Sequence, residues 1–261
     1  MTTDSAAVPA STAIPAATLV LFRERVAGAP PELLMVERSG KMAFAAQALV
    51  FPGGRVDPDD HRLAARFADL SPEDAAARVA AIRETIEESG IAVGLGPAPD
   101  AAGLADLRAA LATGGTPFSA LLDRHRLSLD LAALAPFARW CPKGHETRIF
   151  DTRFYLARAA ADAPEPRVDA TENVHALWIS AADVLEAGSA GTRRLIFPTR
   201  RNLERLAQFA SHAEAIAHAA LHPIDTISPW VEVRDGEQHL CIPAGLGYPV
   251  TAEPLASALR G

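Results

Sequence analysis

Residues 71–90, SPEDAAARVAAIRETIEESG, carry the sequence feature that most limits how this chain can fold. Ser71 is a good N-cap residue, Pro72 suits the first helical position, and Gly90 is typical of a helix C-terminus. The segment therefore predicts one helix that begins and ends at defined residues. Its branched apolar residues share one face, which we expect to pack against a sheet: Val79, Ile82 and Ile86.

The second half of this helix gathers three glutamates and an arginine. Glu84, Glu87 and Glu88 stand at positions i, i+3 and i+4, so they share a face and repel one another by roughly a few tenths of a kcal/mol per pair. Arg83 can pair with Glu87 and leaves the other two uncompensated. A cluster of carboxylates suits a hard divalent cation such as Mg²⁺ or Mn²⁺. On its own, however, such a triplet is more often a solvated helix face, so a second feature has to decide.

That second feature is FPGG, residues 51–54, where a short apolar run enters a sharp turn. Glycine lets a ligand approach the backbone closely, although the tetrapeptide alone indicates only a turn. Together with RETIEESGI, residues 83–91, it resembles the Nudix box, the signature of hydrolases that act on nucleoside diphosphates linked to another group. The resemblance implies catalytic roles for Arg83 and Glu84. It also implies a set of metal ligands, the first through its carbonyl: Gly53, Glu84, Glu87 and Glu88.

The box departs from the usual pattern in two ways. Gly54 and Arg83 lie 29 positions apart, so about fifteen residues are inserted, and we assign the insertion to residues 55–72. The glutamate expected eight positions before the arginine is replaced by Ala75. Three other acids are possible substitutes, and the sequence does not choose among them: Asp57, Glu73 and Asp74.

An insertion at this place, preceded by FAAQALVFPGG, resembles the branch of the family that cleaves coenzyme A and acyl-coenzyme A. Further matches are ERSGKMAF and FPTRRNLERLA, and the resemblance extends from about residue 16 to residue 249. It implies an α+β fold, a Nudix-type αβα sandwich with a mixed central β-sheet and added helices. It also implies a metal-dependent hydrolase with a small-molecule substrate. Two alternatives stay open: a hydrolase of ADP-ribose, NADH or a nucleotide sugar, and a non-catalytic nucleotide-binding Nudix domain, which the alanine at position 75 would favour.

The catalytic base and the substrate-binding cations are less well defined. In many Nudix enzymes the base lies on a later loop, where Glu172 occupies a comparable place, with Asp151 and Glu146 as alternatives. Gly54 leaves room for a phosphate beside the box. Phosphates also need cations, and the candidates are Arg38, Lys41, Arg55, Arg200 and Arg201.

Apolar runs bounded by turn residues predict the remaining organisation. We expect a flexible tail over residues 1–15, one domain over 16–250 with helical elaborations at 99–128 and 198–220, and a C-terminal tail over 251–261. Strands are predicted at 17–26, 32–39, 48–54, 131–143, 147–159 and 172–180, with a last hairpin that turns at Asp235-Gly236.

Composition excludes some functions. The net charge of −7 gives no general attraction to nucleic acid or to an anionic membrane. Cys141 and Cys241 lack metal-ligand spacing and are interpreted as two thiols in a reducing compartment. No run has the length of a membrane-spanning helix and the N-terminus lacks signal-peptide features, so we expect a cytoplasmic protein. A homodimer is possible by family analogy alone.

Overall fold

A mixed β-sheet separates two layers of helices in the computed structural model, which describes residues 13–40, 45–142, 148–168 and 173–258. Within these residues eight strands form the sheet, in the order β10-β7-β8-β1-β2-β3, with β4 paired to β1 and β9 paired to β2. The strands are β1 (Ile14–Arg23), β2 (Glu32–Arg38), β3 (Leu49–Val50), β4 (Gly53–Arg55), β7 (Ala135–Trp140), β8 (Phe150–Arg158), β9 (Asn173–Ser180) and β10 (Thr226–Ile227). β1 pairs antiparallel with β2, and β7 pairs antiparallel with β8, so the strands predicted within 17–39 and 131–159 are confirmed as two pairs; β1 also runs parallel to β8.

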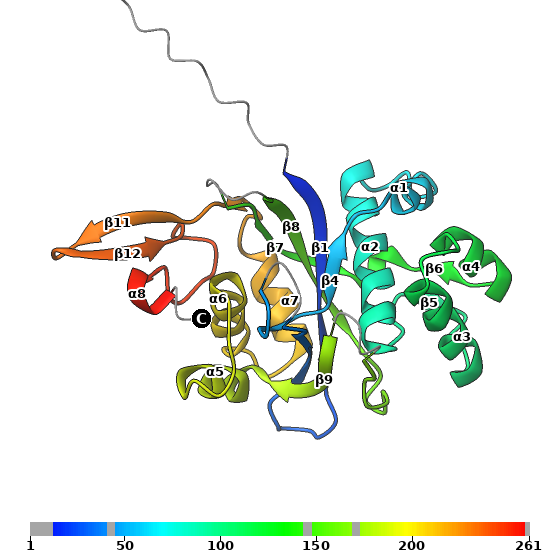
Figure 1. Cartoon of the computed structure of the whole chain (residues 1–261), viewed down its shortest axis with the longest axis horizontal. Helices are drawn as coiled ribbons and strands as arrows, with labels where there is room; N and C mark the ends of the chain where they lie inside the picture. The colour runs from blue at the N-terminus through cyan, green and yellow to red at the C-terminus, as the bar shows by residue number, and fades with distance from the viewer. Residues whose placement is uncertain (1–12, 41–44, 143–147, 169–172, 259–261) are drawn as a thin grey trace, which may run out of the picture.

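The central strand β1 is buried on both faces, because side chains alternate across a sheet. Leu19 and Leu21 enter the apolar core on one side, and Val20 and Phe22 enter the core on the other. The first core is covered by α1 (Pro58–Ala64), α2 (Pro72–Ser89), α3 (Ala101–Ala112) and α4 (Phe118–His125) (Figure 1). The second is covered by α5 (Ala181–Ser189), α6 (Phe197–Leu206) and α7 (His212–Ala220). The predicted α+β fold with an αβα sandwich is confirmed.

Helix α2 begins and ends as its sequence predicts. The Ser71 hydroxyl accepts a hydrogen bond from the Asp74 amide at 3.3 Å, and Gly90 closes the helix with φ 69°. Val79, Ile82 and Ile86 are fully buried against the sheet. Ala75 is fully buried too, so a small side chain at this position lets the helix lie close to its neighbours.

The inserted and added segments carry most of the remaining structure. The sequence of the insertion 55–72 is typical of loop with at most one helical turn; the structure places the seven-residue helix α1 there, whose N-terminus is a capping box between Asp57 and Asp60. The 99–128 elaboration forms α3 and α4, and the 198–220 elaboration forms most of α6 and all of α7. Short elements connect them: β5 (Leu95–Gly96), β6 (Ser128–Leu129) and the 3₁₀ helix η1 (Leu131–Ala133).

Both predicted tails include ordered residues, which corrects the domain boundaries. Ile14 and Pro15, placed in the N-terminal tail, are the first residues of β1. At the other end, β13 (Ala252–Pro254) and α8 (Leu255–Ala258) replace most of the expected C-terminal tail, because β13 pairs with β12. β11 (Trp230–Arg234) and β12 (Glu237–Cys241) form the predicted hairpin, and both turn residues, Asp235 and Gly236, have positive φ.

No helix in the described part of the chain is both long and apolar enough to cross a lipid bilayer.

Candidate functional site

The FPGG turn brings the backbone of β4 against both β1 and α2. Gly53 pairs with Thr18 and Gly54 pairs with Ala17. A Cβ atom at Gly53 would lie 2.4 Å from the Ala17 carbonyl oxygen, so only glycine lets β4 approach β1 this closely. A Cβ atom at Gly54 would lie 2.3 Å from Oε1 of Glu84. The two glycines therefore place the turn directly on the acidic face of α2.

Glu88 lies beneath the turn and is 5% exposed. The Gly53 amide donates to its Oε2 atom at 2.9 Å, and the Nδ2 atom of Asn173 donates to its Oε1 atom at 3.1 Å. Burial raises the pKa of Glu88, and the nearby charge of Glu84 raises it further. The two hydrogen bonds oppose this rise without cancelling it. Both Glu88 oxygens are therefore held in place by residues of β4 and β9.

Arg83 is the hub of the ionic contacts at the site. Its Nε and Nη2 atoms donate to the two carboxylate oxygens of Asp60 at 3.1 and 2.9 Å, and Nη2 also donates to the Arg55 carbonyl at 2.9 Å. Burial alone would lower the pKa of Arg83, but the hydrogen bonds to Asp60 and the charge of Glu84 outweigh it and raise the pKa. Asp60 is itself fully buried, and burial raises its pKa despite the arginine. The guanidinium is therefore a fixed cation that ties the insertion to α2.

Glu84 and Glu87 lie next to Arg83 on α2, and both line a cavity at this face of the helix. The Nη1 atom of Arg83 lies 2.9 Å from Oε1 of Glu84 and 3.8 Å from Oε2 of Glu87. Burial raises the pKa of Glu84, Arg83 lowers it, and the charge of Glu87 raises it again. One arginine thus serves several carboxylates, and the acidic face of α2 keeps a deficit of positive charge.

That deficit fits a divalent cation. Within the described ranges, no three acidic, histidine or cysteine side chains already converge as a metal site. Arg83, Gly53 and Asn173 hold the carboxylate oxygens of Glu84 and Glu88 instead. The donors available are all oxygens, the set that hard cations prefer. Burial, and then repulsion from a neighbouring glutamate, raises the pKa values of Glu84 and Glu88, and a bound cation would oppose both effects.

A cavity of about 1550 Å³ opens over this face of α2, and we call it the site cavity. It brings together most of the site residues predicted from the sequence, all of which contribute to its wall: Arg38, Gly53, Gly54, Arg55, Arg83, Glu84 and Glu87. Glu88 lies behind them and is held by the Gly53 amide.

Other predicted residues lie elsewhere. Arg200 is absent from the site cavity wall, and its Nη2 atom would lie 3.4 Å from a Cβ atom placed on Gly188 of α5. Arg201 is 2% exposed and pairs with Glu204 and Glu253, which corrects its assignment as a phosphate-binding candidate. Asp151 is held by Arg139 and does not line the cavity. Glu172, Lys41 and Glu146 lie outside the described residues.

Two site residues were missed by reasoning from the sequence. Asp60 supplies the buried carboxylate that pairs with Arg83, and none of the three substitutes proposed for the missing glutamate does so as closely. Asp57 comes nearest, at 3.5 Å from Arg83. Asn173 positions Glu88 and lies opposite Arg38 in the β2–β9 ladder. Neither occupies a position of the Nudix box, so no motif identified them.

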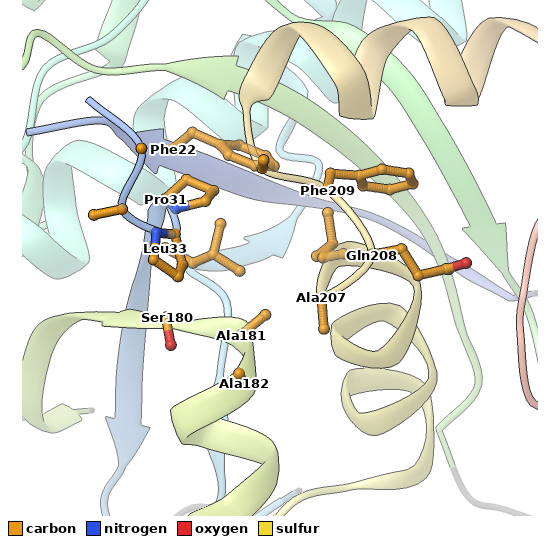
Figure 2. Close-up of a pocket in the computed structure, with 14 residues that line it drawn as sticks. Phe22, Pro31, Leu33, Ser180, Ala181, Ala182, Ala207, Gln208 and Phe209 are labelled. Carbon is orange, nitrogen blue, oxygen red and sulfur yellow. The ribbon is translucent and has the colours of Figure 1, made fainter. Parts of the chain in front are cut away.

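A second cavity, of about 300 Å³, lies on the α5–α6 side of the sheet and is shown in Figure 2. Phe22, Pro31, Leu33 and Phe209 surround it, together with the small residues at the start of α5. Its wall contains no charged side chain among the described residues, so it offers no cation to a diphosphate.

Comparison with known proteins identifies similar chains. Residues 61–206 match the family model described as the NUDT19 Nudix domain. The acyl-coenzyme A diphosphatase NUDT19 of Gallus gallus is 27% identical over 256 residues, covering 77% of this chain and 68% of the relative. The protein of the same name from Homo sapiens is 28% identical, covering 70% of this chain and 53% of the relative. Among solved structures, a NUDIX hydrolase from Alicyclobacillus acidocaldarius superposes with a TM-score of 0.69 and 31% identity, over 80% of this chain and 97% of that one.

Proposed function

Because this chain belongs to the Nudix hydrolases of the NUDT19 type, we propose that it hydrolyses the diphosphate of coenzyme A or of an acyl-coenzyme A. Nudix hydrolases generally need a divalent cation, and we propose Mg²⁺ or Mn²⁺ here because the donors at the site are oxygens. Water would add across the P–O–P bond, giving a 4′-phosphopantetheine product, acylated or free, and adenosine 3′,5′-bisphosphate. The observation that carries the proposal is the contact of the FPGG turn with Glu84, in the wall of the site cavity, and with Glu88 directly behind it.

Each residue near the diphosphate has a distinct part in this proposal. Glu84, Glu87 and Glu88, with the Gly53 carbonyl, would hold the cation. When bound, the cation neutralises phosphate charge and lowers the pKa of a water molecule.

The protein positions these ligands by hydrogen bonds. Asp60 orients Arg83, and Arg83 in turn holds Glu84. Asn173 and the Gly53 amide hold Glu88 from two sides. Such supporting contacts typically change metal affinity or activity by about 10–100-fold when they are removed.

Substrate phosphates would meet Arg38 and Arg55 at the wall of the site cavity. Arg38 has a buried Nε atom with no hydrogen-bond partner among the described residues, which leaves it able to donate to a phosphate oxygen. Gly54 has no side chain, so a phosphate could approach the backbone closely at the same wall. Glu172 remains the proposed general base, and the test is a Glu172→Gln variant, which should lose rate with little change in metal affinity.

The structure weakens the case for a non-catalytic domain. That alternative depended on the acid missing at Ala75, but Asp60 supplies a buried carboxylate to Arg83 from the insertion. All three helix glutamates are also present. We therefore favour the enzyme over the binding domain.

The proposal is tested by a product assay with either cation on coenzyme A, acyl-coenzyme A, ADP-ribose and NADH. We expect cleavage of the coenzyme A substrates, no cleavage in EDTA, and weaker turnover of the other two. Preference for ADP-ribose or NADH would replace the proposed substrate and keep the reaction type. No turnover of any diphosphate would refute the proposal.

A further inference from the structure

The site cavity extends from the acidic face of α2 into two regions whose side chains differ in charge. One region lies toward β2, β7 and β8, and its wall contains both arginine and aromatic side chains, among them Arg38, Arg148, Phe51 and Phe150. The other lies toward α1, α3 and α4, and we call it the distal arm. Its wall comes from Asp57, Pro58, Asp59 and Arg62 at α1, and from Leu111, Gly114–Thr116, Pro117 and Phe118 at the α3–α4 turn.

The charged side chains of the distal arm already have partners. Asp59 accepts hydrogen bonds from the Ser119 amide at 2.8 Å and the Ser119 hydroxyl at 2.9 Å. Arg62 lies 3.0 Å from the same carboxylate. Asp57, the remaining charged residue beside them, lies 3.5 Å from Arg83. Among the described residues that α1 and the α3–α4 turn contribute to this wall, Arg62 is the cation, and Asp59 already pairs with it.

This difference in charge orients a coenzyme A thioester in the cavity. One end of the molecule carries adenine and a 3′-phosphate, which require cations and flat apolar surfaces. The other end is an uncharged pantetheine arm that carries the acyl chain, which gains by leaving water. The cationic, aromatic region suits the first end, and the distal arm suits the second.

The insertion in the Nudix box is what builds the distal arm. Asp59 belongs to α1, and its contact with Ser119 satisfies the N-terminal amide of α4, a role normally taken by a residue of the same helix. Removing α1 would leave α4 without this cap and would open the wall. The inserted residues and the added helices thus act together.

We propose that the distal arm, formed by α1 with the α3–α4 turn, binds the acyl chain of the substrate and sets the preference for acyl-chain length. This inference rests on the proposed function and goes beyond it by assigning a binding site to a part of the cavity that contains no catalytic group.

Gly115 can take a larger side chain at the wall of the arm without disturbing the fold. It lies in the cavity wall, and a Cβ atom at this residue would have no heavy atom within 4 Å. Its φ is not positive, so a larger residue meets no backbone strain. Ala112, at the end of α3, is exposed and lies outside the cavity wall, which makes it a matched control.

The test compares Gly115→Phe and Ala112→Phe with the parent chain. The quantity measured is the ratio of kcat/KM for palmitoyl-coenzyme A to kcat/KM for free coenzyme A. We expect this ratio to fall at least about tenfold in Gly115→Phe and to stay unchanged in Ala112→Phe, with equal melting temperatures. Titration of palmitoyl-coenzyme A in EDTA gives a second readout, and we expect weaker binding in Gly115→Phe alone.

An unchanged ratio and unchanged binding in Gly115→Phe would overturn the acyl site and leave the proposed function standing. A parent chain that cleaves neither substrate would refute the proposed function, and this inference with it.

Discussion

Replacing Gly54 by alanine should damage the active site while leaving the fold intact. The added Cβ atom would lie 2.3 Å from Oε1, 2.4 Å from Cδ and 2.8 Å from Oε2 of Glu84. Carbon atoms in ordinary contact are about 3.5–4.0 Å apart, so the carboxylate has to withdraw by roughly 1 Å. All three clashing atoms belong to the end of one side chain, which can move without shifting the backbone.

The expected loss follows from that displacement. A misplacement of about 1 Å in a catalytic group costs on the order of 10²-fold in rate. Because the backbone is not displaced, we expect the free energy of unfolding to change by less than about 1 kcal/mol.

Gly53→Ala is the matched comparison. Its Cβ atom would lie 2.4 Å from the carbonyl oxygen of Ala17 and 2.8 Å from the Cα atom of Thr18. Both are backbone atoms, which cannot move without shifting strand β1. We expect this variant to lose about 1–3 kcal/mol of unfolding free energy, as overpacked cores do.

The assay is kcat/KM for coenzyme A at saturating cation, with urea unfolding of each variant. Gly54→Ala should lose activity without losing stability, and Gly53→Ala should lose stability. The reasoning would be refuted if Gly54→Ala kept activity within about threefold of the parent chain, or if it were the less stable of the two.

Three further predictions concern neighbouring residues and pH. Glu88→Gln keeps the shape of the buried side chain and removes a charge that burial already disfavours, since burial raises the pKa of Glu88. We therefore expect the same urea unfolding as in the parent chain and a loss of kcat above about 10²-fold. Near-normal activity would show that the metal site has been misplaced. Asp60→Asn removes the buried carboxylate paired with Arg83, and we expect a loss of about 3 kcal/mol in urea unfolding; a loss below about 1 kcal/mol would argue against the ion pair. Burial lowers the pKa of His212, so the unfolded chain binds its proton more readily and stability falls as pH drops from about 6.5 toward the folded pKa. The urea concentration at the unfolding midpoint should therefore fall less between pH 7.5 and 5.5 in His212→Gln than in the parent chain. An equal fall would show that His212 is not the cause of the pH dependence.

The fold was predictable where local signals and the family resemblance agreed. Helix α2 begins after Ser71 and ends before Gly90 as expected, and Asp235-Gly236 forms the predicted hairpin turn. Each of these features depends on residues adjacent in sequence, so pattern and propensity suffice. The insertion was expected to be loop with at most one helical turn, although Asp57 and Pro58 are local signals of a helix start; its contacts with α2 and α4 hold the longer helix α1 in place.

The site was predictable only as far as the box extends. Gly53, Gly54 and the helix glutamates come together because the turn and α2 are two halves of one motif. Asp60 and Asn173 reach the site from α1 and β9 through the tertiary fold, and their own sequence neighbours carry no signal of it. Arg200 was proposed as a phosphate contact because of its charge alone, and the tertiary fold directs its guanidinium toward α5.

The central claim is tested most directly by mass spectrometry of the products formed from coenzyme A. Incubation with Mg²⁺ or Mn²⁺ should yield adenosine 3′,5′-bisphosphate and 4′-phosphopantetheine in equal amounts, and neither product in EDTA. Intact coenzyme A after prolonged incubation with both cations, or cleavage at a bond other than the diphosphate, would contradict the account.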